Sequence, residues 1–241
     1  MTALVSIENL HVERGGYPAV IDFSYKVAKP GWTGIIGANG SGKTSLLSAI
    51  AGRFPVKSGR ILIEGVDVTH DRAARARQIG FAVEGRLLPD ELSAREVFGI
   101  ASERRGAIDA AELGELRSAL NFERFIDRRC SALSSGMRQR VALFAAFLDL
   151  PKIVILDEPF NWLDAVTAFD VKSALTALVA KQQIALVTAL HDISTMTASC
   201  QEGALMSGGR IAMIMKEADL RAGLNDPVTF EATMVQKLRT G

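Results

Sequence analysis

A glycine-rich segment at residues 37–44 has the residue types and the spacing of a phosphate-binding loop. Its sequence, GANGSGKT, fits the pattern G-x-x-x-x-G-K-[ST], with an apolar run before it and a predicted helix after it. Glycines let successive backbone N–H groups point at phosphate oxygens, at the positive end of a helix dipole. We expect Lys43 to reach the β- and γ-phosphates of ATP and Thr44 to ligate Mg²⁺. The residues predicted to bind ATP are Gly37, Asn39, Gly40, Ser41, Gly42, Lys43, Thr44 and Ser45.

Polar residues also follow two further apolar runs. Asp157 and Glu158 come after the run at 153–156, and His191 comes after the run at 184–190. Ligands of open parallel sheets bind at the carboxyl ends of the strands, so these ends favour a nucleotide site over a glycine-rich turn that only begins a helix. We expect Asp157 to hold Mg²⁺, Glu158 to polarise the attacking water and His191 to contact the γ-phosphate. The alternatives are an acidic helix cap and a structural histidine.

Two other segments could add contacts to the nucleotide. Tyr17 lies upstream of the glycine-rich loop and either stacks on adenine or packs locally, and the sequence leaves both possibilities open. The segment LSSGM at 133–137 precedes a strongly predicted helix, so it forms a second helix N-terminus able to bind an anion.

The composition of the chain limits the classes of protein to which it can belong. The chain has 241 residues, 48% of them hydrophobic, and a formal net charge of +1. This suits one α/β domain and argues against a nucleic-acid partner. No apolar stretch reaches the roughly 20 residues that span a bilayer, and Glu8 and Glu13 interrupt any leader segment, so we expect a cytoplasmic protein. Cys130 and Cys200 are too few for a disulfide framework or a metal cluster and are predicted to be buried.

The hydrophobic pattern changes along the chain. Residues 4–12 are predicted to form an edge strand, and residues 166–181 a helix. Between residues 84 and 135 the alternation disappears and helix formers dominate, which predicts a helical insertion between strands. The apolar residues assigned to a common face of the helix at 166–181 are Val166, Phe169, Leu175, Leu178 and Val179.

These motifs together resemble the nucleotide-binding subunit of ATP-binding cassette (ABC) transporters, over about residues 4–218. The resemblance implies the ABC ATPase fold: an α/β P-loop NTPase core with a mostly parallel sheet, an N-terminal antiparallel β subdomain and an inserted helical subdomain. The single domain 1–241 then divides into a core at 1–83 and 136–241 and an insertion at 84–135. The motifs stand in family order: the P-loop at 37–44, the signature at 133–137, the Walker B strand at 153–158, the D-loop at 161–164 and the switch His191.

The resemblance also implies how the protein works. Two copies would sandwich two Mg-ATP, with Ser134, Ser135 and Gly136 of one copy facing the P-loop of the other and Asp164 at the seam. ATP hydrolysis would drive a separate integral membrane permease, which would hold the subunit at the cytoplasmic face of the membrane. The single-cassette length and the run at 137–140 look more like bacterial exporter subunits, so export is favoured over import. The alternative is a soluble ABC ATPase without a transport role.

The chain departs from the family pattern in three places. Glu84 falls where the family usually has the glutamine of the Q-loop, the signature LSGGQ is replaced by LSSGM, and Trp162 is bulky for a D-loop. A carboxylate at 84 and a side chain at Ser135 are expected to change turnover more than nucleotide binding.

The segment GRLLPDEL at 85–92 follows Glu84 directly and places Leu87 and Leu88 between charged residues. Apolar patches rimmed by polar groups mark interaction surfaces, so we expect this segment to dock a membrane partner. The alternative is that both leucines pack beneath the helical segment.

Overall fold

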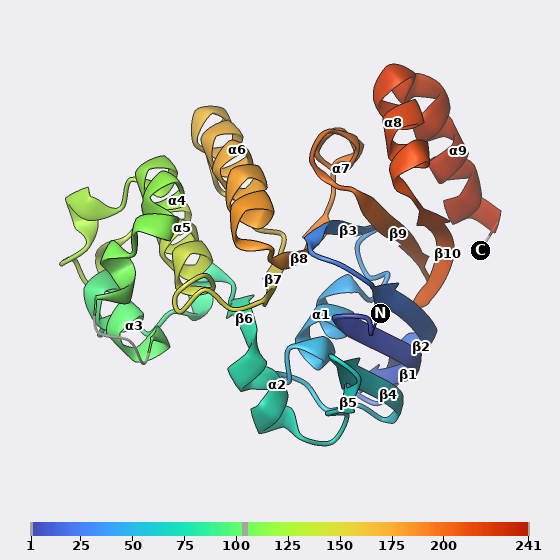
Figure 1. Ribbon diagram of the computed structural model, residues 1–241, viewed down its shortest axis with the longest axis horizontal. Helices are drawn as coiled ribbons and strands as arrows, with labels where there is room; N and C mark the ends of the chain where they lie inside the picture. The colour runs from blue at the N-terminus through green and yellow to red at the C-terminus, as the bar shows by residue number, and fades with distance from the viewer. Residues whose placement is uncertain (1, 103–105, 241) are drawn as a thin grey trace.

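The computed structural model describes residues 2–102 and 106–240, which form two β-sheets with a helix between them (Figure 1). The first sheet is antiparallel in the order β2-β1-β4-β5. The second has the order β10-β9-β3-β8-β7-β6, and all its strand pairs are parallel except β9 with β10. The strands are β1 Val5–Arg14, β2 Tyr17–Val27, β3 Gly31–Gly37, β4 Ser58–Ile63, β5 Val66–Asp67, β6 Ile79–Ala82, β7 Ile153–Asp157, β8 Ala185–Leu190, β9 Glu202–Ser207 and β10 Arg210–Met215.

Helix α1 (Lys43–Ile50) lies between the two sheets and fills the smaller hydrophobic core. Leu46 and Leu47 are fully buried in this core, where apolar residues of both sheets surround them. Burying one leucine stabilises the fold by about 1.5–3 kcal/mol. The glycine-rich loop before α1 is therefore anchored at both ends, by a central strand and by a buried helix.

The other face of the parallel sheet packs against helices and forms the larger core. Helix α5 (Ser135–Ala145) and helix α6 (Ala165–Gln182) cover this face, and the described part of 84–135 folds into α3 (Ala94–Ala101), α4 (Gly114–Leu120) and short 3-10 turns. Phe98, Phe122 and Phe144 join this segment to α5, with ring centroids 4.6–5.3 Å apart. The helical character expected for 84–135 is observed, while its status as a subdomain stays a proposal.

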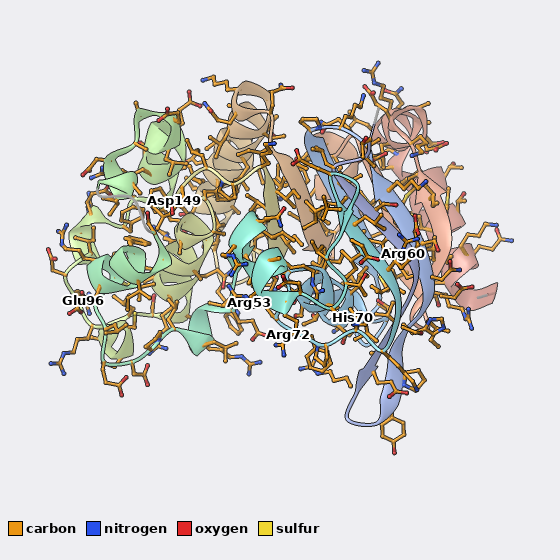
Figure 2. The ribbon with its side chains drawn as sticks, turned by 60° about the horizontal axis from the view of Figure 1, so that its bottom comes forward. Arg53, Arg60, His70, Arg72, Glu96 and Asp149 are labelled. Carbon is orange, nitrogen blue, oxygen red and sulfur yellow. The ribbon has the colours of Figure 1, made fainter. Side chains whose placement is uncertain are left out.

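Four further helices complete the chain: α2 (Arg72–Gln78), α7 (Ile193–Ser199), α8 (Glu217–Asn225) and α9 (Pro227–Thr240). Arg72 at the start of α2 donates to the carbonyls of Gly52 and Arg53, which ties α2 to the turn after α1 (Figure 2). Cys130 and Cys200 are both buried, as predicted. Within residues 2–102 and 106–240, no helix combines the length and the apolar character that crossing a membrane requires.

Two predictions about individual elements were wrong. Strand β1 is not at an edge, because it pairs with β2 on one side and with β4 on the other. Val166 and Phe169 do not share the buried face of α6: each is 71% exposed, whereas Leu175 and Leu178 are buried. At about 100° per residue, positions nine apart lie on opposite sides of a helix, so Val166 faces away from Leu175 and Phe169 away from Leu178.

Candidate functional site

The glycine-rich loop connects β3 to α1 at the carboxyl edge of the parallel sheet. Strand β3 lies between β8 and β9, so the loop leaves from the middle of the sheet. Gly42 caps α1 with φ of 103°, and a Cβ there would come within 2.2 Å of the Ala19 carbonyl oxygen. Only glycine fits at this position, which explains why the motif requires it.

Backbone carbonyls of the loop hold the Lys43 side chain. Its Nζ donates to the carbonyl oxygens of Gly37 at 2.8 Å and Ala38 at 3.3 Å. Burial lowers the pKa of Lys43, and the charges of Glu158 and Asp157 oppose that shift. The Ser41 Oγ nearby is buried without a hydrogen-bond partner among the described residues. A cation and an unpaired donor on a tight loop fit a bound phosphate chain.

Asp157 ends strand β7 beside the P-loop. Thr44 hydrogen-bonds its carboxylate, whose Oδ1 is buried and has no partner in the described chain. Burial is the main reason that the pKa of Asp157 is raised, and the nearby charges of Glu158 and Glu84 add to it. A buried carboxylate oxygen next to a hydroxyl fits Mg²⁺, which takes few protein ligands when phosphates supply the others. The described residues contain no cluster of three or more His, Cys, Asp or Glu arranged to hold a metal.

Glu158 has both carboxylate oxygens engaged. Its Oε1 lies 2.6 Å from His191 Nε2, and its Oε2 accepts from Asn161 Nδ2 at 2.8 Å. The parallel pairing of β7 with β8 brings these strand ends together. Glu158 itself has a φ of 49°, a left-handed conformation that is uncommon outside turns and functional sites. The two residues predicted for catalysis, Glu158 and His191, are therefore in direct contact.

The sequence prediction missed Asn161 and Gln139. Asn161 was placed in the D-loop only, although it lies one turn after Glu158 and so can reach back to it. The buried Gln139 accepts from Gly85 N–H at 3.2 Å and donates to the Pro159 carbonyl at 3.4 Å. It joins the segment after Glu84 to the segment after Glu158, a long-range contact that no local pattern indicates.

The signature segment begins helix α5. Ser134 caps the helix, and its Oγ accepts from Met137 N–H at 3.2 Å. A Cβ on Gly136 would come within 2.5 Å of the Trp162 carbonyl oxygen. The close approach of the D-loop of the same chain therefore requires glycine at this position. Met137, in place of the family's amide, packs against the larger core.

A cavity of about 520 Å³ separates the strand ends from the start of α5. Glu84 faces it and forms an ion pair with Arg86. Trp162, which is 75% exposed, also faces this space. The residues lining it that the sequence analysis singled out are Thr44, Glu84, Ser135, Asp157, Glu158 and Trp162.

Tyr17 begins strand β2 and is 78% exposed, so it does not pack locally. The carbonyl of Ala19, two residues further along β2, lies against Gly42 of the P-loop. Stacking on adenine stays a prediction. Asp164 caps α6 by accepting from Thr167 N–H at 2.9 Å, and it pairs with Arg140 at 3.1 Å. These contacts give Asp164 a role within the chain, and its place at a dimer seam stays a prediction.

Comparisons with known proteins agree with this geometry. A family model described as "ABC transporter" matches residues 20–161. The chain is 33% identical over 219 residues to a "Probable sulfate/thiosulfate import ATP-binding protein CysA" of Chlorella vulgaris, covering 90% of this chain and 92% of that protein. It is also 33% identical to the "Sulfate/thiosulfate import ATP-binding protein CysA" of Synechocystis sp., of which it spans 60%.

Solved structures show the fold. One described as "Structure of ATP binding subunit of ABC transporter" superposes with a TM-score of 0.83 at 23% identity, covering 96% of this chain and 99% of that chain. Another, of a "bacterial Atm1-family ABC exporter with ATP bound", gives a TM-score of 0.77 at 23% identity and covers 97% of this chain and 41% of the exporter chain. The predicted fold class is confirmed.

Proposed function

Since the chain belongs to the ABC transporter family as an ATP-binding, ATP-hydrolysing cassette, we propose that it uses Mg-ATP to power import through a separate integral membrane permease. The observation that carries the chemical part is the contact between Glu158 Oε1 and His191 Nε2 at 2.6 Å. It supports the assignment of Glu158 as the base and of His191 as the group that orients it, beside the P-loop and Asp157. That arrangement suits attack of water on a terminal phosphate.

Each residue has a separate role in the proposed reaction. Lys43 exchanges the carbonyls of Gly37 and Ala38 for phosphate oxygens when ATP enters. Thr44 and Asp157 hold Mg²⁺, which when bound neutralises phosphate charge. Glu158 accepts the proton of the attacking water. His191 keeps the carboxylate of Glu158 oriented toward the site and contacts the γ-phosphate.

The proposal includes a second copy of the chain. In such a dimer, Ser134, Ser135 and Gly136 face the partner's P-loop and Asp164 lies at the seam. Exposed apolar side chains support this arrangement: Trp162 in the D-loop is 75% exposed, and Val166 on the first turn of α6 is 71% exposed. Apolar groups so close to a catalytic loop favour burial against another protein surface.

The permease is proposed to dock beside Glu84. Leu87 is 64% exposed, while Leu88 is buried and lines a cavity of about 320 Å³ between the helical segment and β6. The two leucines expected to dock together therefore have different environments. We assign the docking surface to Leu87, and Leu88 to packing beneath it. Docking would hold the subunit at the cytoplasmic face of the membrane.

Import replaces the export expected from the sequence. The relatives of Chlorella and Synechocystis are both named as import subunits, so the preference for export has no support. The exporter whose structure superposes well is only 23% identical and supports the fold alone. A soluble ABC ATPase without a transport role is the competing function.

Co-purification tests the proposal. The tagged full chain is extracted from membranes of its host with detergent, and the integral membrane protein bound to it is identified and reconstituted with it in liposomes. We expect Mg-ATP to drive solute in the direction of import. Leu87→Asp should abolish retention on the membrane without loss of ATPase activity. Val66→Asp, a control at the same 64% exposure in β5 of the antiparallel sheet, should leave retention unchanged. Absence of any bound membrane protein would favour the soluble alternative.

A further inference from the structure

Three carboxylates face the cavity between the strand ends and α5. Asp157 and Glu158 come from the end of β7, and Glu84 comes from the segment after β6. The proposed nucleotide site therefore carries one negative charge beyond the two that metal binding and proton transfer use.

An extra carboxylate should oppose the binding of ATP. The triphosphate is a polyanion, and a like charge across a partly buried cavity repels it. Mg²⁺ at Thr44 and Asp157 would offset part of the phosphate charge but would not remove the charge of Glu84. Some other positive group has to compensate for it.

Arg86 is the cation placed to do so. It follows Glu84 by two positions, in the 3-10 turn Gly85–Leu87, and its Nε donates to Glu84 Oε2. Arg86 lines the same cavity. Arg138 also lines the cavity, but it is engaged by an ion pair with Asp90. Lys43 is bound to carbonyls of the P-loop.

We propose that Arg86 is a positioning residue that holds the Glu84 carboxylate and cancels its charge, so that the pair presents an uncharged group to Mg-ATP. The proposal rests on the proposed nucleotide site. It assigns a role to a side chain that carries none in the reaction outlined above.

The exposure of the pair does not conflict with this role. The side chains of Arg86 and Glu84 are 78% and 44% exposed, so the ion pair adds little to folding stability. Its effect is on the electric field in the cavity, where the ligand is highly charged. Because partly exposed charges are screened by salt, the effect should weaken as ionic strength rises.

The test is a set of full-length variants: wild type, Arg86→Gln, Glu84→Gln and the double variant. The dissociation constant of Mg-ATP is measured by calorimetry at low and high salt. At low salt, Arg86→Gln should weaken binding by about fivefold, and about 0.5 M salt should remove most of that loss. In the Glu84→Gln background the exposed Arg86 has lost the partner that holds it at the cavity, so the same substitution should have a clearly smaller effect. Arg86→Lys should bind like wild type because it keeps the charge.

The outcomes separate this inference from the proposed function. If Arg86→Gln binds like wild type at both salt concentrations, the inference is wrong. It is also wrong if the substitution weakens binding equally with and without Glu84, since Arg86 would then act on the nucleotide directly. Failure of the wild type itself to bind Mg-ATP would instead overturn the proposed nucleotide site.

Discussion

The two sides of the central cavity differ in how closely they follow the family pattern. On the strand side, the P-loop, Asp157, Glu158 and His191 all keep the expected residues. On the helical side, Glu84 and Ser135 both depart from it, as does Trp162 in the D-loop that approaches α5, and all three line the cavity. From this difference we propose that the strand side provides nucleotide binding and chemistry, while the helical side sets how fast the chemistry proceeds.

The physical settings of the two sides agree with this division. The strand-side residues are fixed by parallel pairing of β3, β8 and β7 and by the buried helix α1. The helical side packs on the sheet through side chains of the larger core, and Gln139 adds hydrogen bonds to Gly85 and Pro159. A side held by strand pairing provides fixed geometry, whereas a side held by side-chain packing can shift when a ligand binds.

Loss of Lys43 should have the largest effect on the strand side. Lys43→Ala removes a charged donor from the phosphates, so we expect Mg-ATP affinity to fall by about a hundredfold or more. Equilibrium titration with a fluorescent ATP analogue measures this. Unchanged affinity would show that the P-loop does not hold the triphosphate through Lys43.

Glu158→Gln should separate chemistry from binding. The amide cannot accept a proton, so hydrolysis should fall by at least about a hundredfold, while ATP affinity stays close to that of the wild type. With ATP, the variant should accumulate as a dimer, which light scattering after size exclusion detects. Hydrolysis at nearly the wild-type rate would remove Glu158 from the role of base.

Removing Asn161 should have a smaller effect on the same carboxylate. Asn161→Ala deletes the donor to Glu158 Oε2 and leaves His191 as its remaining partner, so kcat should fall by about tenfold. The ATP dissociation constant should change little, because the Asn161 side chain donates to Glu158 and not to the P-loop. A variant with wild-type kcat would show that His191 alone fixes the base.

The smallest expected effect is on stability, at the cap of α6. Hydrogen bonds from Thr167 are the main reason that the pKa of Asp164 is lowered. A lowered pKa means that the cap stabilises the fold above the usual carboxyl pKa, and that this stability is lost as the pH falls through the folded-state pKa. Asp164→Ala should therefore lower Tm by a few degrees at neutral pH.

Asp164→Asn is the matched control, because asparagine caps helices equally well but does not titrate in this range. Thermal melts at neutral and acidic pH should show that the Tm of Asp164→Asn rises relative to the Tm of the wild type as the pH falls. If Ala and Asn lower Tm equally, Asp164 does not act as a helix cap.

The strand side could be predicted from the sequence because its pattern is local. A glycine motif follows one apolar run, and Asp157 ends another. Each pattern identifies the functional residue and also places it at the carboxyl edge of the sheet. Asn161 and Gln139 could not be predicted in this way, since their partners depend on how a turn folds back or on distant segments meeting. Val166 and Phe169 are apolar but lie on the opposite side of α6 from Leu175 and Leu178, a difference that follows from helical phase and not from hydrophobicity.

A single-turnover experiment on the double variant Glu84→Gln/Ser135→Gly tests the division between the two sides most directly. With saturating Mg-ATP and enzyme in excess, the amount of nucleotide bound reports on the strand side, and the rate constant of cleavage reports on chemistry. We predict equal nucleotide occupancy, a dissociation constant within a few-fold of the wild type and a changed cleavage rate constant. A large change in affinity with an unchanged cleavage rate constant would contradict the account.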